Sequence, residues 1–130
     1  MKPNFIEAIQ PCAELLLECV GRRFYAAPAD GPAAKAFASA LSATPLALAT
    51  FSCHDGQTCE LPFALPPGDA PIAVRPGDLL LIGDRTLLLS RIAGAFTAAR
   101  LARLGDKADA IFSRIASGDP ILRISVEWSE

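Results

Sequence analysis

The sequence contains little of the chemistry on which metal sites and nucleophilic active sites depend. It has one histidine, His54, and four cysteines, none of which forms a C-x-x-C pair. Structural zinc sites draw four Cys or His ligands from characteristic spacings, so no Cys/His zinc site is expected. The G-x-S-x-G elbow, the G-x-x-x-x-G-K loop, the H-E-x-x-H helix and the dinucleotide-binding fingerprint are also missing. The sequence therefore supports no familiar enzyme class, cofactor or metal.

The sequence also lacks a strong charge of one sign and a long apolar run. Its 12 basic and 14 acidic side chains give a formal charge of −2, which offers no electrostatic footprint for DNA, RNA or an anionic membrane. A membrane-spanning helix needs about 18 to 20 apolar residues, and the apolar stretches here are much shorter. Glu7 interrupts the region where a signal peptide needs apolar residues. We therefore expect a cytoplasmic protein without nucleic-acid or membrane partners.

The chain is instead rich in short leucine runs. With 130 residues, 52% of them apolar, it can bury the core of one domain. Residues 74–90 read V-R-P-G-D-L-L-L-I-G-D-R-T-L-L-L-S, with apolar runs on both sides of Gly83-Asp84, a pair suited to a two-residue turn. Strands that are apolar on both faces belong inside a sheet that is covered on both sides or closed on itself. Residues 74–90 are therefore predicted to form the central hairpin.

Other strands are predicted from alternation and turn residues. Residues 13–20, 23–27, 100–104 and 122–128 each read as a strand. Residues 46–53 and 58–63 flank H-D-G-Q, which predicts a hairpin with Asp55-Gly56 as its two-residue turn. That register places Cys53 and Cys59 on opposite faces and argues against a disulfide. Reduced, buried thiols are the expected state of the cysteines, with metal binding as the alternative.

Two amphipathic helices complete the predicted elements. The first has Pro32 in its first turn and a buried stripe over residues 34–41, and it ends at Thr44-Pro45. The second covers residues 108–115, between Gly105-Asp106 and Gly118. Residues 64–71 read as a loop, residues 91–100 as an irregular crossing, and residues 1–12 as a lead-in to a single domain over residues 13–130. About eight strands in consecutive hairpins favour a closed antiparallel barrel, with an open α+β sheet as the competitor.

The order of these segments resembles the small bacterial cyclophilin-like proteins of unassigned function. The resemblance is carried by A-K-A-F-A-S-A-L, G-Q-T-C-E-L-P-F, R-P-G-D-L-L-L-I, L-A-R-L-G and G-D-P-I-L-R-I-S-V-E, and it covers roughly residues 13 to 128. It implies a closed eight-stranded barrel with two helices. True cyclophilins carry an R-F-x-x-x-F-type motif, whereas Arg23-Phe24 is followed here by Y-A-A-P. The resemblance therefore assigns no catalytic residue.

Four residues are candidates for a ligand site: His54, Arg91, Phe96 and Arg100. A guanidinium near a barrel opening could bind a carboxylate, although exposed arginines that pair with acids are the simpler interpretation. Phe96 either lines a pocket or fills the core. His54 falls in a hairpin turn, where a solvated side chain is expected. The alternative is that His54 acts as a base beside a nucleophilic cysteine, Cys53 or Cys59.

Two classes of function remain open from the sequence. The first is a module that binds a small molecule or a peptide, and it is slightly favoured. The second is an enzyme, either a degenerate prolyl isomerase or a component of an amide hydrolase. A third option is an interaction domain that forms a homodimer through an exposed strand or helix. Asp78 and Asp84 flank the first strand of the central hairpin, where aspartate commonly accepts hydrogen bonds from turn amides, so they are assigned a structural role.

Overall fold

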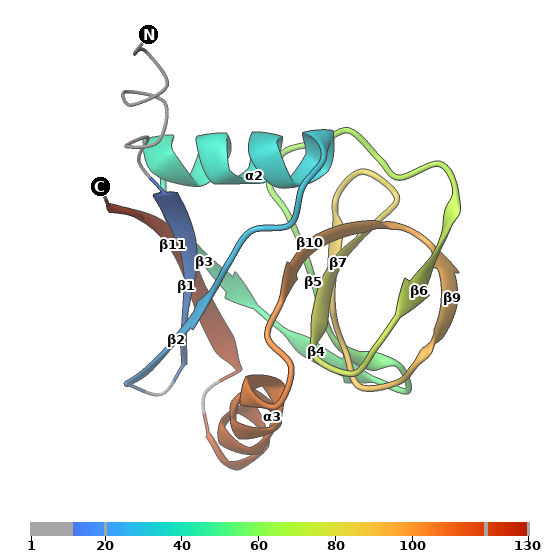
Figure 1. The fold of residues 1–130 in the computed structure, drawn as a ribbon. Coiled ribbons are helices and arrows are strands. Elements are labelled where there is room, and N and C mark those ends of the chain that lie inside the picture. The colour runs from blue at the N-terminus through green and yellow to red at the C-terminus, as the bar shows by residue number, and fades with distance from the viewer. Residues whose placement is uncertain (1–11, 20, 119, 130) are drawn as a thin grey trace, which may run out of the picture.

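The computed structural model describes residues 12–19, 21–118 and 120–129. The lead-in predicted over residues 1–12 lies outside these ranges, except for Cys12. The described ranges form eleven strands in three sheets and two helices, so the expected mainly β class is confirmed (Figure 1). The bounds are β1 Cys12–Cys19, β2 Arg22–Ala26, α2 Pro32–Ala43, β3 Leu46–Ala49, β4 Phe51–Cys53, β5 Gly56–Glu60, β6 Pro71–Val74, β7 Asp78–Ile82, β8 Thr86–Ser90, β9 Gly94–Thr97, β10 Ala99–Arg103, α3 Lys107–Ser117 and β11 Ile121–Ser129.

The predicted central hairpin is confirmed as β7 and β8. The two strands pair antiparallel, with Leu80 opposite Leu88. Ile82 pairs with Thr86, so the turn contains residues 83–85 and is one residue longer than predicted. Gly83 adopts a φ of 66°, a left-handed conformation that glycine reaches without steric strain.

The predicted closed barrel is wrong, because the described strands form three open sheets. Their orders are β2-β1-β11-β3, β10-β7-β8-β5-β4 and β6-β9. At one corner the chain passes from β3 to β4 through Thr50, whose N–H donates to the carbonyl of Pro120 over 3.0 Å. At the other corner the chain after β2 meets β10 at one isolated bridge, between Pro28 and Ala102. Next to this bridge the N–H of Ala29 donates to the carbonyl of Leu101 over 2.8 Å, but β2 and β10 are not paired as neighbouring strands in the described sheets.

The two larger sheets enclose the main hydrophobic core. Helix α2 lies across one end of both sheets and packs on β10 and β11, while α3 covers the opposite end (Figure 1). Phe37 from α2 and Ile111 from α3 are fully buried in this core, together with Leu81 and Leu101 of the five-stranded sheet and Ile124 of the four-stranded sheet. The helices therefore act as packing elements, as the sequence predicts.

A second, smaller core lies on the other face of β7 and β8. Leu80 and Leu88 pack there with Val74 and Ala98, and Phe96 packs against them. The cover is the β6–β9 sheet, in which Ile72 pairs with Phe96. Residues 91–100 were expected to be irregular, but their small residues suit a short strand pressed closely onto another sheet. Burial on both faces explains why the β7 and β8 sequences are apolar throughout.

The helix ends follow the turn chemistry of the sequence. Pro32 occupies the first turn of α2, where its missing N–H leaves no hydrogen bond unmade. The helix stops at Ala43, and the N–H of Thr44 donates to the carbonyl of Ala40 over 3.0 Å. Helix α3 ends before Gly118. Both predicted helices are therefore confirmed, and no helix in the described ranges is both long and apolar enough to cross a bilayer.

The β4–β5 hairpin has a different register from the one predicted. Cys53 pairs with Gly56, so the turn is His54-Asp55. A Cβ atom on Gly56 would lie 2.0 Å from the carbonyl oxygen of Leu89, so this glycine permits the close approach of β8. Cys53 and Cys59 still lie on opposite faces of the ribbon, one exposed and one buried, and both are free thiols.

Candidate functional site

A fully buried carboxylate, Asp78, organises the polar part of the molecule. Its Oδ2 accepts hydrogen bonds from the backbone N–H of Arg75 over 3.0 Å and from Arg100 Nε over 3.2 Å. Its Oδ1 accepts a hydrogen bond from Arg103 Nε over 3.1 Å. The bond to the Arg75 amide confirms the predicted turn role of Asp78. Asp84 differs, because it is exposed and its backbone carbonyl accepts the N–H of Leu65 over 2.8 Å.

A β-bulge in β10 brings both arginines to the face of Asp78. Arg100 pairs with Leu80, Ala102 pairs with Leu79, and Arg103 pairs with Asp78, so the register shifts between Arg100 and Ala102. In a regular strand, residues three apart point to opposite faces. The extra residue in a bulge changes this alternation, so the two arginines share the outer face of the sheet.

The arginine–aspartate cluster, comprising Asp78, Arg100 and Arg103, carries a net positive charge. It contains two guanidinium groups and one carboxylate within ion-pair distance. The side chain of Arg100 is 27% exposed and that of Arg103 is 50% exposed, whereas Asp78 is fully buried. Arg100 Nη2 also donates to the carbonyl of Ala73, which fixes β10 to β6. One arginine would neutralise Asp78, so the second leaves an excess cation.

Arg100 also lines a cavity, which we call the Arg100 cavity. Its volume is about 450 Å³, and it lies between the start of α2, the loop over residues 66–69 and the first part of β10. Gly68 allows this loop to approach the sheet, because a Cβ atom on Gly68 would lie 2.3 Å from the carbonyl oxygen of Ala98. The lining combines aliphatic side chains with three charged ones, Asp30, Asp69 and Arg100.

An apolar groove of about 340 Å³ adjoins the Arg100 cavity along α2. Ala29 and Ala34 line both spaces. The groove has one charged lining residue among those described, Lys35. It extends the apolar surface next to the cavity.

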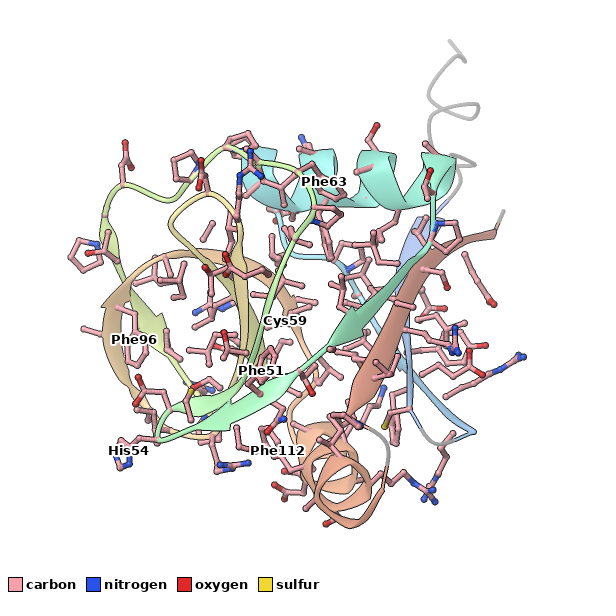
Figure 2. All side chains as sticks on the ribbon, turned by 180° about the vertical axis from the view of Figure 1, so that it is seen from behind. Phe51, His54, Cys59, Phe63, Phe96 and Phe112 are labelled. Atoms are coloured by element: carbon pink, nitrogen blue, oxygen red, sulfur yellow. The ribbon has the colours of Figure 1, made fainter. Side chains whose placement is uncertain are left out.

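The other three predicted site residues do not line the Arg100 cavity. His54 is exposed in the β4–β5 turn, and Phe96 is half-buried on β9, opposite Ile72 of β6 (Figure 2). The guanidinium carbon of Arg91 lies 4.4 Å from the ring centre of Phe112 on α3. The structure therefore brings Arg100 alone of the four to this cavity. Asp78 was interpreted only as a turn residue, and the bulge that joins it to Arg103 leaves no mark in the sequence.

The cysteines and the histidine do not form a nucleophile-and-base pair in the described part of the chain. Burial, together with the smaller effect of the nearby Glu60 carboxylate, raises the pKa of the Cys59 thiol to about 11. Cys59 therefore stays protonated near neutral pH. Cys53 is exposed beside His54, and neither thiol hydrogen-bonds to this histidine among the described residues. The same residues contain no group of three His, Cys, Asp or Glu side chains that could hold a metal ion.

Comparisons with known proteins add no further identification. The chain matches no protein-family model, no curated protein and no solved structure. The resemblance to cyclophilin-like proteins therefore stays a prediction from the sequence. The function has to be argued from the geometry of the site.

Proposed function

We propose that the protein is a binding module for a small molecule or a short peptide, and that the Arg100 cavity is its site. The volume of about 450 Å³ falls in the usual range for ligand pockets, which is roughly 300 to 1,000 Å³. Such pockets combine mostly apolar walls with a few fixed polar groups. The observation that carries the proposal is that Arg100 belongs both to this cavity and to the arginine–aspartate cluster.

The cluster supports the proposal because it holds Arg100 in place before a ligand arrives. Arg100 is tied through Nε to Asp78 and through Nη2 to the carbonyl of Ala73. An arginine side chain loses substantial rotamer entropy when it is ordered, and here folding has already ordered it. A ligand that contacts Arg100 therefore avoids most of this cost, which is the general benefit of preorganisation.

A thermal-shift screen tests the binding function directly. A ligand of the native state raises the melting temperature by mass action. Ala29→Phe places a large side chain at the lining of the cavity, whereas the control Ala47→Phe changes an exposed residue of β3. We expect at least one class of compound to raise the melting temperature of the native protein and of Ala47→Phe, but not of Ala29→Phe. A screen without any such compound contradicts the proposal.

A protease-coupled isomerase assay on a proline peptide distinguishes the alternative function, an enzyme, from a binding module. The binding proposal predicts no isomerase activity at this site. We expect isomerisation at the background rate, unchanged by Arg100→Ala. A rate above background that Arg100→Ala abolishes would favour the enzyme instead.

A cytoplasmic location forms part of the proposal. Its support is that Cys19, Cys53 and Cys59 are all free thiols, as is usual in reducing compartments. Separation of the source cells into compartments, followed by immunodetection, tests this part. Detection only in an extracytoplasmic fraction would contradict it.

A further inference from the structure

The Arg100 cavity has charges of opposite sign on its two sides. Arg100 lies on the sheet side, whereas Asp30 precedes α2 and Asp69 belongs to the loop over residues 66–69. Among the described residues, Arg100 pairs with Asp78 and makes no ion pair with either of the two exposed acids. The positive and negative groups therefore stay separate, and the cavity is dipolar.

The positive side keeps charge and donors for a ligand. Asp78 is shared with Arg103, so it cannot cancel the charge of both guanidinium groups. A guanidinium carries five N–H donors in a planar fork. Arg100 uses Nε for Asp78 and one Nη2 hydrogen for the Ala73 carbonyl, which leaves its other Nη hydrogens. A carboxylate is well matched to such donors in geometry and charge.

The negative side consists of the two exposed carboxylates, Asp30 and Asp69. Solvent screens them, so each attracts a cation more weakly than a buried group would. Between the two charged sides the lining is aliphatic, with Pro32, Pro66 and Ile72 among its residues. This middle part suits a small apolar body better than a polar one.

From this arrangement we propose that the cavity binds an amino acid or a short peptide in its zwitterionic form. The carboxylate of the ligand binds Arg100, its ammonium group lies toward Asp30 and Asp69, and its side chains contact the proline and isoleucine walls. The inference rests on the proposed binding function and adds the chemical class of the ligand. It follows from the juxtaposition of an arginine with excess charge and two unpaired acids across one cavity.

Arg103 is a positioning residue in this proposal. It does not line the cavity, but it binds the second oxygen of Asp78. Without Arg103, the full charge of Asp78 would face Arg100 and would weaken the attraction of Arg100 for a carboxylate. Loss of Arg103 should therefore affect ligands with a free carboxylate and no others.

Three matched probes separate the two charges of the ligand. They are alanylalanine, its N-acetylated form, which lacks the ammonium group, and its C-terminal amide, which lacks the carboxylate. We expect amidation to weaken binding about tenfold, because it removes a charge-assisted bond to Arg100. Acetylation should weaken binding only about threefold, because the acids that it affects are exposed. Amide signals of Gly68, Ala98 and Ala99 in ¹⁵N–¹H spectra locate the bound peptide.

Variants test the same charges from the protein side. The double variant Asp30→Asn/Asp69→Asn should weaken alanylalanine about threefold and should not weaken the acetylated form, which has no ammonium group for these acids to attract. Arg103→Ala should weaken alanylalanine and the acetylated form about threefold and leave the amide unchanged. Arg123→Ala, an exposed arginine on β11, is the control and should change no affinity. Asp30 and Asp69 are exposed and lie outside the arginine–aspartate cluster. The double variant therefore tests the charge of the cavity without disturbing the cluster.

Equal affinity for all three dipeptides would overturn the inference, and so would a set of shifted signals that excludes Gly68, Ala98 and Ala99. If no dipeptide binds, but a neutral or singly charged compound stabilises the native protein and does not stabilise Ala29→Phe, the proposed class of ligand is wrong and the binding function stands. If no compound of any class stabilises the native protein, the binding function itself is wrong.

Discussion

Arg103 Nε lies 3.1 Å from Asp78 Oδ1, and this ion pair joins a half-exposed cation to a fully buried anion. Water screens the arginine side of the pair but cannot reach the carboxylate. A buried carboxylate without enough donors is strongly destabilising, so the burial of Asp78 depends on all of its partners together. The cluster is therefore a structural requirement of the fold as well as the support of the proposed site.

Removal of the buried carboxylate should destabilise the fold. We expect Asp78→Ala to lower the free energy of unfolding by about 3 kcal/mol, because two cations and the Arg75 amide lose their acceptor. Urea unfolding, followed by circular dichroism, measures the change. The control is Asp69→Ala at an exposed position, which should change it by less than about 0.5 kcal/mol. Equal effects of the two substitutions would show that the cluster does not stabilise the fold.

The two arginines should contribute unequally. Arg100 is 27% exposed and Arg103 is 50% exposed, so solvent screens the second pair more strongly. Double-mutant cycles that combine Asp78→Ala with Arg100→Ala or with Arg103→Ala measure the two coupling free energies. We expect the larger coupling for Arg100. A larger coupling for Arg103 would contradict the role of exposure.

The Cys59 thiol should make stability depend on pH in the alkaline range. Burial raises its pKa to about 11 in the folded protein, whereas an unfolded thiol ionises near pH 8.5. Between these values the unfolded chain binds fewer protons than the folded chain, so stability falls as the pH rises. Below about pH 8.5 both states are protonated and the loss vanishes.

Urea unfolding under reducing conditions at several pH values measures this effect. The loss attributable to Cys59 should approach about 3 kcal/mol near pH 11. Cys59→Ala removes the titrating group, so the difference between its profile and that of the native protein isolates the contribution of this thiol. Cys53→Ala at an exposed position is the matched control and should keep the native slope. If the free energy of unfolding of Cys59→Ala and that of the native protein change in parallel with pH, the alkaline loss of stability does not come from Cys59.

Local turn chemistry made much of the fold predictable from the sequence. The leucine runs around Gly83 identify β7 and β8 because their apolar pattern has one explanation, burial on both faces. Pro32, Thr44 and Gly118 likewise mark the helix ends through backbone rules that act within one turn. These signals depend on neighbouring residues alone, so tertiary contacts do not overrule them.

Features that arise from contacts between distant segments were not predictable in this way. Gly56 was assigned to a turn, but it is needed for the approach of the Leu89 carbonyl from another strand. The bridge between Pro28 and Ala102 joins segments far apart in the sequence, so no local pattern reports that the sheets meet there at a single point. The bulge in β10 places Arg103 beside Asp78, and no local spacing rule reports a bulge. The site was therefore only partly predictable, through Arg100.

The stacking of Arg91 on Phe112 should stabilise the contact between α3 and the segment that directly follows β8. The guanidinium carbon lies 4.4 Å from the ring centre, so a cation–π attraction of about 0.5 to 1 kcal/mol is expected at this exposed position. A double-mutant cycle of Arg91→Ala and Phe112→Leu, followed by urea unfolding, measures it. Arg22 and Phe24, 5.6 Å apart, form a longer contact that should give a smaller coupling. A coupling no larger than this control would contradict the prediction.

Gly68 should be essential for the wall of the Arg100 cavity although its backbone needs no special conformation. A Cβ atom there would lie 2.3 Å from the carbonyl oxygen of Ala98, and backbone atoms on both sides cannot move aside easily. We expect Gly68→Ala to lower the free energy of unfolding by about 2 kcal/mol and to shift the loop over residues 66–69 away from β10.

Gly83→Ala provides the matched control for this substitution. Its φ is 66° and a Cβ atom there meets nothing within 4 Å, so only the left-handed backbone is strained. That strain amounts to about 1 kcal/mol and leaves the cavity intact. Urea unfolding and the amide signals of Ala98 and Ala99 distinguish the two variants, because Gly68→Ala alone should move these signals. If both variants leave the signals in place, contact with β10 does not position the loop, and Gly68 has no part in forming the cavity.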